Sequence, residues 1–185
     1  MRVTSLFRLV GLISIAVVGF AIVVRAQDVN YNAMPGTDFS KFKTYRWVTV
    51  EGAQKPDQIT DRMIRNSIDA QLAKKGLKKV DDASANLYVA YQVAINQEKQ
   101  FNAYGTGGGY YGYRMGGGMG TVTSQTIQVG TLEVDMYDSA AKELVWKGQA
   151  SKTLDTDADQ EKRQKNLDKA TEKLLKNYPP PAKKN

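Results

Sequence analysis

The sequence predicts an α+β domain: an antiparallel or mixed sheet of about four to five strands, with two amphipathic helices packed on one face. Several stretches alternate apolar and polar residues, which is the period of a half-buried strand. Two others repeat apolar residues at every third or fourth position, as a helix with one buried side does. Their order is strand, helix, short strand, three long strands and helix, which favours an antiparallel meander with helical cover.

The first predicted strand covers about residues 44–50. Tyr45, Trp47 and their β-branched neighbours favour extended backbone. Phe39 and Phe42 come just before this strand, and we expect both rings to enter the core.

The first helix is predicted over residues 58–75. Asp57 is a favourable N-cap, and Gly76 supplies the left-handed residue that commonly ends a helix. The apolar residues on one side of this helix are Ile59, Met63, Ile64, Ile68 and Leu72. A short strand is expected next, at residues 77–80.

Three long strands follow in the pattern. The first covers about residues 87–101, and the second covers 123–137. In the second strand the apolar residues change parity at Gly130, which predicts a bulge or a twist there. A hairpin turn at 138–142 leads to the third strand, residues 143–153.

A second helix ends the domain. Asp157 or Asp159 is its expected N-cap. Its apolar stripe consists of Leu167, Ala170, Leu174, Leu175 and Tyr178. Consecutive prolines end it, and residues 181–185 form a basic tail.

Residues 104–120 differ in composition from the rest of the chain. Nine of the 16 glycines lie here, so no core can be built from this segment and a flexible loop is predicted. Four tyrosines lie among them: Tyr104, Tyr110, Tyr111 and Tyr113. Tyrosines on a flexible backbone make an adaptable contact surface for a protein or a glycan. The alternative is a solvated linker without a partner.

The first 26 residues read as a secretory signal. A basic start is followed by the uncharged apolar run 9–24 and by small side chains, which predicts cleavage between Ala26 and Gln27. The run has 16 residues, whereas a spanning helix needs about 20. Arg25 lies inside the cleavage motif, so a short uncleaved anchor is the alternative. The folded domain would then be residues 27–180.

Composition excludes several classes of function. The formal charge is +7, and +4 remains after residues 1–26, without the concentrated basic patch of a nucleic-acid binder. The chain has no Cys, which excludes disulfides and a lipid on a processed cysteine. It has no His, so the usual general base and the commonest metal ligand are missing.

Two motifs resemble ligand sites without meeting their requirements. Residues 107–112 match G-x-G-x-x-G, but more glycine follows where the phosphate-binding helix should begin. Residues 155–159 resemble the start of a calcium loop, but Gln160 and Asn166 replace the required Gly and Glu. We therefore expect no cofactor and no metal.

Recognisable catalytic arrangements are also missing, so the chain is expected not to be an enzyme. Serine-based catalysis lacks its histidine. The alternative is an envelope hydrolase that uses carboxylates such as Asp81, Asp82 or Asp135.

Five segments carry a family resemblance: residues 38–47, 85–91, 130–138, 144–148 and the end of the last helix at 178–180. Over about residues 29–180 the chain resembles the family of domain of unknown function 4136. The resemblance implies a bacterial envelope protein, often a lipoprotein, with no assigned activity and no catalytic residues. We therefore expect an exported binding or structural module, periplasmic or anchored through residues 9–24. Its expected partner is an envelope protein or a glycan, and not a nucleic acid.

Overall fold

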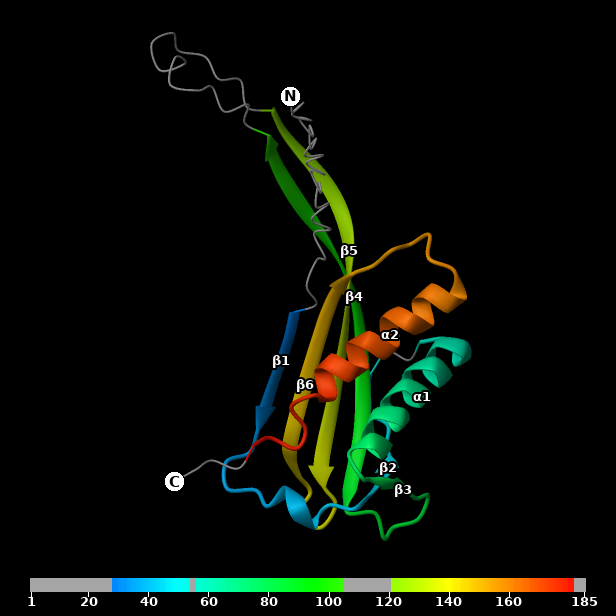
Figure 1. The fold of residues 1–185 in the computed structure, drawn as a ribbon, viewed down its shortest axis with the longest axis vertical. Coiled ribbons are helices and arrows are strands. Elements are labelled where there is room, and N and C mark those ends of the chain that lie inside the picture. Colours follow the sequence, from blue (N-terminus) through cyan, green and yellow to red (C-terminus); the bar gives the residue numbers. More distant parts are fainter. Residues whose placement is uncertain (1–27, 54–55, 105–120, 182–185) are drawn as a thin grey trace, which may run out of the picture.

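The computed structural model describes residues 28–53, 56–104 and 121–181. They form one six-stranded mixed sheet, in the strand order β1-β6-β5-β4-β2-β3, together with two α-helices (Figure 1). The α+β class is confirmed, but the sheet has more strands than expected and is not purely antiparallel. The predicted cleavage site at Ala26 and Gln27 lies outside the described residues. No helix within the described ranges is long and apolar enough to span a membrane.

The strands are β1 (Asp28–Ala33), β2 (Thr44–Trp47), β3 (Lys78–Lys79), β4 (Leu87–Tyr104), β5 (Thr121–Asp138) and β6 (Glu143–Thr153). The helices are the short 3₁₀ helix η1 (Phe39–Lys41) and the α-helices α1 (Gln58–Lys74) and α2 (Gln160–Leu175).

Strand β1 is not among the predicted elements, the first of which begins at about residue 44. It pairs antiparallel with β6, from Asp28↔Ser151 to Ala33↔Trp146. Asp and Asn are depleted in strands, and they conceal the alternation of Val29, Tyr31 and Ala33 in this segment. An edge strand tolerates such polar residues because their side chains reach solvent.

Strand β2 makes the sheet mixed, since it pairs parallel with both β3 and β4. Parallel neighbours need a crossover connection, and α1 provides it between β2 and β3. The strand ends at Trp47 rather than at residue 50, because the chain turns away there toward α1.

Both α-helices pack on the same face of the sheet. Tyr91, Val134 and Gly148 are cross-strand neighbours on β4, β5 and β6. The Tyr91 hydroxyl donates to Asp61 of α1, and Leu174 of α2 lies directly over Gly148. Figure 1 shows the helices side by side on this face. The largest fully buried side chains include Tyr45, Ile68, Leu72, Leu87, Val134, Met136, Trp146, Leu174 and Tyr178.

Strands β4 and β5 are much longer than their neighbours. Pairing with β6 ends at Val129↔Thr153, and pairing of β4 with β2 ends at Val89. β4 and β5 still pair with each other from Gln97↔Gln128 to Tyr104↔Thr121. We call residues 97–104 and 121–128 the ribbon, and the rest of the described chain the body. The ribbon projects from the end of the body and extends beyond both α-helices (Figure 1).

The prediction of a bulge at Gly130 is wrong. β4 and β5 pair in unbroken register there, and the irregularity between β5 and β6 lies between Met136 and Tyr137. By strand alternation Ile127 and Val129 face the side of the sheet opposite the helices. The change of apolar parity therefore marks the place where β5 leaves its helical cover.

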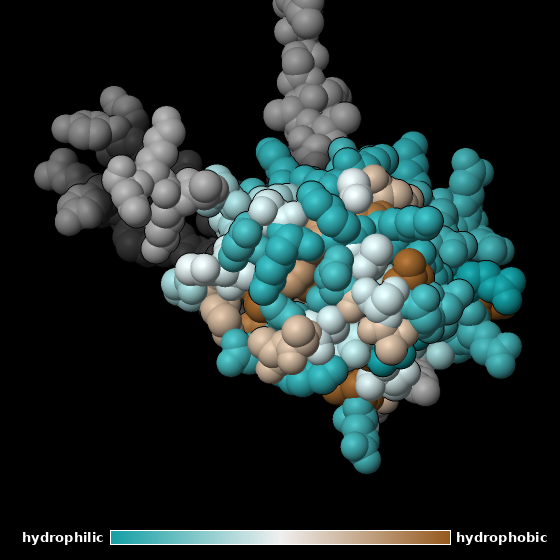
Figure 2. All heavy atoms as spheres, turned by 90° about the horizontal axis from the view of Figure 1, so that it is seen from below, coloured by the Kyte–Doolittle hydropathy of each residue, from teal (hydrophilic) through white to brown (hydrophobic). Residues whose placement is uncertain are grey.

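The opposite end of the molecule is mostly hydrophilic. Figure 2 views the body from that end and shows small hydrophobic areas separated by hydrophilic side chains. The described residues there offer no broad apolar surface in this view.

Candidate functional site

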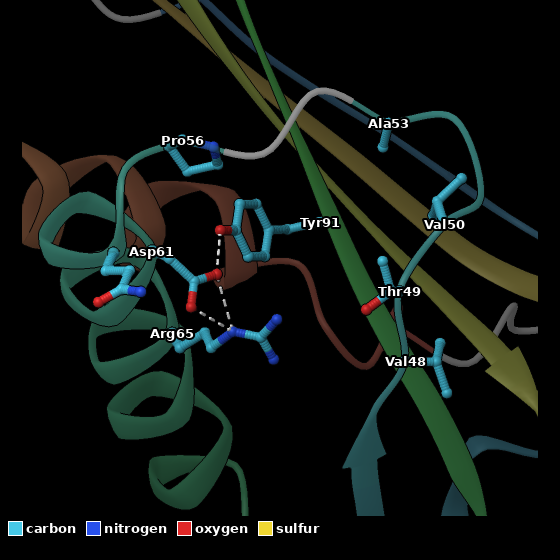
Figure 3. Close-up of a pocket in the computed structure, with 9 residues that line it drawn as sticks. Val48, Thr49, Val50, Ala53, Pro56, Asp61, Arg65 and Tyr91 are labelled. Atoms are coloured by element: carbon cyan, nitrogen blue, oxygen red, sulfur yellow. Dashed lines mark hydrogen bonds and ion pairs between the residues drawn. The ribbon is translucent and has the colours of Figure 1, made fainter.

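A cavity of about 190 Å³ lies between α1 and the chain segment that follows β2 (Figure 3). One wall is largely aliphatic, and the other carries polar side chains of α1 and β4. Its lining residues are Val48, Thr49, Val50, Ala53, Pro56, Gln58, Asp61, Arg65 and Tyr91.

The polar groups of this cavity satisfy one another. Arg65 Nε donates to both carboxylate oxygens of Asp61, at 2.9 and 3.1 Å, and the Tyr91 hydroxyl donates to the same carboxylate. The Arg65 guanidinium also lies 4.8 Å from the centre of the Trp47 ring. Burial, together with the Asp61 carboxylate, raises the pKa of Tyr91, so its hydroxyl stays protonated. This wall therefore holds a fixed polar cluster and no activated nucleophile.

A second cluster beside it has the same character. Asp69 of α1 accepts from the Tyr45 hydroxyl at 2.7 Å and from Trp47 Nε1 at 2.9 Å. Lys79 Nζ lies 3.1 Å from the other oxygen of this carboxylate. Burial followed by the bond to Asp69 raises the pKa of Tyr45. The carboxylate fastens α1 to β2 and β3, which is a structural role.

A larger depression of about 590 Å³ lies along α1 and α2. Its base includes a hydrogen bond from the Ser67 hydroxyl to Asp168, and Gln164 Nε2 donates to both residues at 2.8 Å. The rest of the lining is mainly Lys, Glu and other long polar side chains. These bonds join the two helices, and the depression holds no converging set of unpaired groups among the described residues.

The carboxylates considered for a hydrolase are not brought together. Asp81 and Asp82 lie exposed in the turn after β3, where Asp82 accepts hydrogen bonds from Ser84 that lower its pKa. Asp135 lies in the middle of β5, and neither of the two cavities above is lined by any of the three. The geometry gives no support to this alternative.

Asp135 instead belongs to a cluster that the sequence did not reveal. It is only 4% exposed, although it lies on the face of the sheet opposite the helices. Lys147 Nζ is 3.8 Å from Asp135 Oδ1 but 2.8 Å from Glu133 Oε1, and Asp135 Oδ1 has no hydrogen bond within the described residues. Burial raises the pKa of Asp135 against the opposing effect of Lys147. The strand register was needed to see these neighbours.

Of the four candidate contact tyrosines, only Tyr104 falls on a described element. It ends β4 and pairs with Thr121 of β5, at the far end of the ribbon. Tyr110, Tyr111 and Tyr113 lie outside the described residues, in the Gly/Tyr-rich segment 105–120. Tyr104 and Thr121, the described residues on either side of that segment, form the terminal pair of the ribbon.

The ribbon itself is exposed on both faces. In β4, residues 97–99 are exposed, and in β5 residues 123–126 are exposed. The side chains are mostly amides and hydroxyls, with one acid and one lysine at Glu98 and Lys99. This polar composition is the one expected of two paired strands that bury no hydrophobic core between them and another element.

Residues 28–180 match the family model described as domain of unknown function, DUF4136. The chain belongs to this family. No curated protein matches the chain. The family assignment confirms the resemblance seen in the sequence, and it brings no established activity.

Several solved structures are similar. A PDZ domain protein from Parabacteroides distasonis is 15% identical with a TM-score of 0.55, over 85% of this chain and 37% of that one. A DUF4136 family protein from Bacteroides thetaiotaomicron is 16% identical with a TM-score of 0.49, over 83% and 96% of the two chains. The PelC dodecamer from Paraburkholderia phytofirmans is 12% identical with a TM-score of 0.48, over 81% and 95%. At such identities, the likeness to the first of these concerns the fold alone.

Proposed function

We propose that this chain is an exported, non-enzymatic binding module of the bacterial cell envelope. It contacts another envelope protein through the ribbon and the Gly/Tyr-rich segment at its end. One observation carries the proposal: β4 and β5 continue for eight residue pairs beyond the body, with exposed side chains on both faces.

The ribbon is costly to order and adds little to the core. A two-stranded hairpin is at best marginally stable in water, so the body must hold these strands in place. Exposed strand edges also invite pairing with other chains, and proteins usually shorten or cover them. A long uncovered ribbon is therefore better explained as a contact surface.

A protein partner fits the ribbon better than a glycan. Strand edges offer backbone donors and acceptors at the spacing of another extended peptide, which is how strand addition recognises a partner. On the β4 side, Glu98 and Lys99 supply charges of both signs that can select for a complementary strand.

The absence of an activity is part of the proposal. The polar groups of the described cavities bond to one another, as Asp61, Arg65 and Tyr91 do. The sequence also lacks histidine, the most frequent general base. Export is supported by the signal pattern of residues 1–26.

Crosslinking in intact cells tests the contact. A photo-crosslinking amino acid at Gln97, on the β4 edge of the ribbon, should join the full chain to one distinct envelope protein, identified by mass spectrometry. The same probe at Lys169, exposed on α2, is the control and should give no such product. Equal products at both sites, or a sugar without a second polypeptide, would contradict the proposal.

The N-terminus of the protein recovered from cells tests export. A chain that begins at Gln27 shows a cleaved signal, and an intact chain in the membrane fraction shows the short anchor. An intact chain in the cytoplasm would contradict the proposal that the protein is exported.

A further inference from the structure

The two long edges of the ribbon differ in charge. On the β4 side, residues 97–104 include Glu98 and Lys99. On the β5 side, residues 121–128 contain no charged residue, no proline and no glycine, and five of the eight are β-branched. Charges and prolines usually keep an edge strand from pairing with its own copies. The β5 edge of the ribbon has neither, so nothing in its sequence opposes such pairing.

The hydrogen-bond pattern shows which backbone groups face this edge. Leu154 N donates to the Gln128 carbonyl at 2.7 Å, so that carbonyl points to the β6 side of β5. Backbone direction alternates along a strand. The N–H and C=O groups of Thr126, Ser124 and Val122 therefore point the same way, beyond Val129↔Thr153, the last residue pair of β5 with β6.

The other side of β4 gives an independent check. Val48 N donates to the Val89 carbonyl at 2.8 Å, and Val89 is paired with Met136 of β5. Odd residues of β4 and even residues of β5 therefore both point away from their shared ladder. Continued along the ribbon, the same alternation makes Gln97 and Lys99 the outward residues of the β4 edge.

We propose that the β5 edge of the ribbon pairs with the same edge of a second copy of this chain. The strands run antiparallel, with a two-fold axis at Ser124, so that Ser124 faces Ser124 of the second copy. Val122 then faces Thr126 of the second copy, and the reverse. All three outward residues form hydrogen-bonded pairs in this register.

Neighbouring registers use the edge less well. An axis at Gln125 would match Val122 with Gln128 of the second copy, but the Gln128 carbonyl already accepts from Leu154. An axis at Thr123 would place Thr126 opposite Gly120 of the second copy, which lies outside the described residues. Among the described residues, the register centred on Ser124 therefore makes the most bonds, and an isologous contact of this kind closes as a dimer.

Charge and shape both favour a second copy as the occupant. An antiparallel self-pair places residues opposite others of the same segment, and this segment has no charges to repel each other. The two Gly130 residues, at the edges of the bodies, would be separated by twelve residue steps, or roughly 40 Å at about 3.4 Å per residue. The two bodies thus stay apart while the uncharged edges meet.

This inference rests on the proposed role of the ribbon as a contact surface, and it names one partner of one edge. Sedimentation velocity of the purified full chain, over a wide range of concentration, tests it. We expect a reversible equilibrium between monomer and dimer. Ser124→Lys and Ser124→Glu should each weaken dimerisation by roughly tenfold or more, because like charges then face each other across the axis.

Mixing the two variants sharpens the test. In a mixed dimer the introduced lysine faces the introduced glutamate across the axis, which is an opposite-charge pair. The equimolar mixture should therefore regain the dimer that each variant lacks, which a folding defect could not produce. Gln97→Lys and Gln97→Glu, on the β4 edge of the same ribbon, are matched controls and should dimerise like the unaltered chain.

Three results would overturn the inference: a monomer at every concentration, a dimer that Ser124→Lys leaves intact, or a mixture that stays monomeric. A monomer in solution would leave the proposed function standing if the Gln97 crosslink persists in cells. If the dimer forms but the Gln97 crosslink is lost, the inference of self-pairing stands and the proposed function fails. The two outcomes are separable because self-pairing through β5 leaves the β4 edge open.

Discussion

Strands β4 and β5 run through both the body and the ribbon, but their side chains are buried to different extents in the two parts. In the body, Val89 of β4 and Val134 of β5 are completely buried under the helices. Six residues further along β4, on the same face as Val89 and next to the base of the ribbon, Ile95 is 66% exposed. On this face of the sheet, the helices therefore decide whether an apolar residue of β4 is buried. The helices confine the core to one part of two continuous strands and leave the rest as surface.

The largest effect should come from the core side of this comparison. Trp146 is 1% exposed, and its ring lies 5.6 Å from that of Tyr178 in an edge-on contact. Trp146→Ala should lower the free energy of unfolding by about 3–5 kcal/mol, because it leaves a cavity under α2. Urea unfolding followed by circular dichroism measures it. Gln149→Ala, exposed on the same strand, is the control, and a comparable loss there would break the comparison.

A pair of glycines gives the next test. A Cβ at Gly148 would overlap Trp146 Cη2 and would lie 2.8 Å from Leu174 Cδ1, with no room to give way. Gly148→Ala should therefore cost about 1–3 kcal/mol through overpacking. At Gly130, next to the ribbon, the same Cβ would meet only Leu154, which is 38% exposed and can move. Gly130→Ala should unfold like the unaltered protein in urea, and equal losses would show that packing is as tight at the ribbon base.

Two aspartates of β5 should respond to pH in opposite senses. The hydrogen bond from Lys41 Nζ at 2.6 Å lowers the pKa of Asp138 below its ordinary 3.8. Its stabilising effect is present above that ordinary value and is lost as the pH falls through the folded-state pKa. Asp138→Asn should therefore make unfolding less sensitive to acid in thermal melts between neutral and strongly acidic pH.

Burial raises the pKa of Asp135, so the sign is reversed there. The folded state favours its protonated form, and that advantage is complete below the ordinary value of 3.8 and is lost as the pH rises through the folded-state pKa. Asp135→Asn should therefore gain stability relative to the unaltered chain as the pH rises. The same series of melts reports it, and a parallel pH dependence for both proteins would contradict it.

The smallest effect should come from removing the ribbon. Asn96 and Val129 are paired at its base, so a two-residue Asn-Gly turn can join them and replace residues 97–128. The body should keep its melting temperature within a few degrees, because most of the deleted side chains whose exposure is described, in 97–100 and 123–128, are exposed. A large drop, or loss of cooperative unfolding, would show that the ribbon supports the body after all.

Local signals in the sequence were enough to predict most elements of the body. The predicted helix at 58–75 is α1, which ends one residue earlier, with Asp57 as its cap and Gly76 in the left-handed conformation. The third long strand was predicted with the bounds of β6, and the second helix is capped by Asp159. Capping and periodicity act over a few residues, so the sequence displays them directly.

Features that depend on distant partners were not predicted. The parallel pairing of β2 and the addition of β1 to β6 depend on tertiary contacts. The neighbours of Asp135 come from adjacent positions of two strands and emerge only when the register is known. The ribbon was missed for a related reason: alternation predicts a strand, but not whether anything lies beside it.

The unbroken pairing of β4 and β5 also makes the reach of the molecule adjustable. Adding one residue to each strand lengthens the ribbon by about 3.4 Å. The ribbon side chains whose exposure is described are mostly exposed, so such an insertion requires no compensating change beneath the helices. The distance at which the Gly/Tyr-rich segment is presented can thus be altered independently of the fold that supports it.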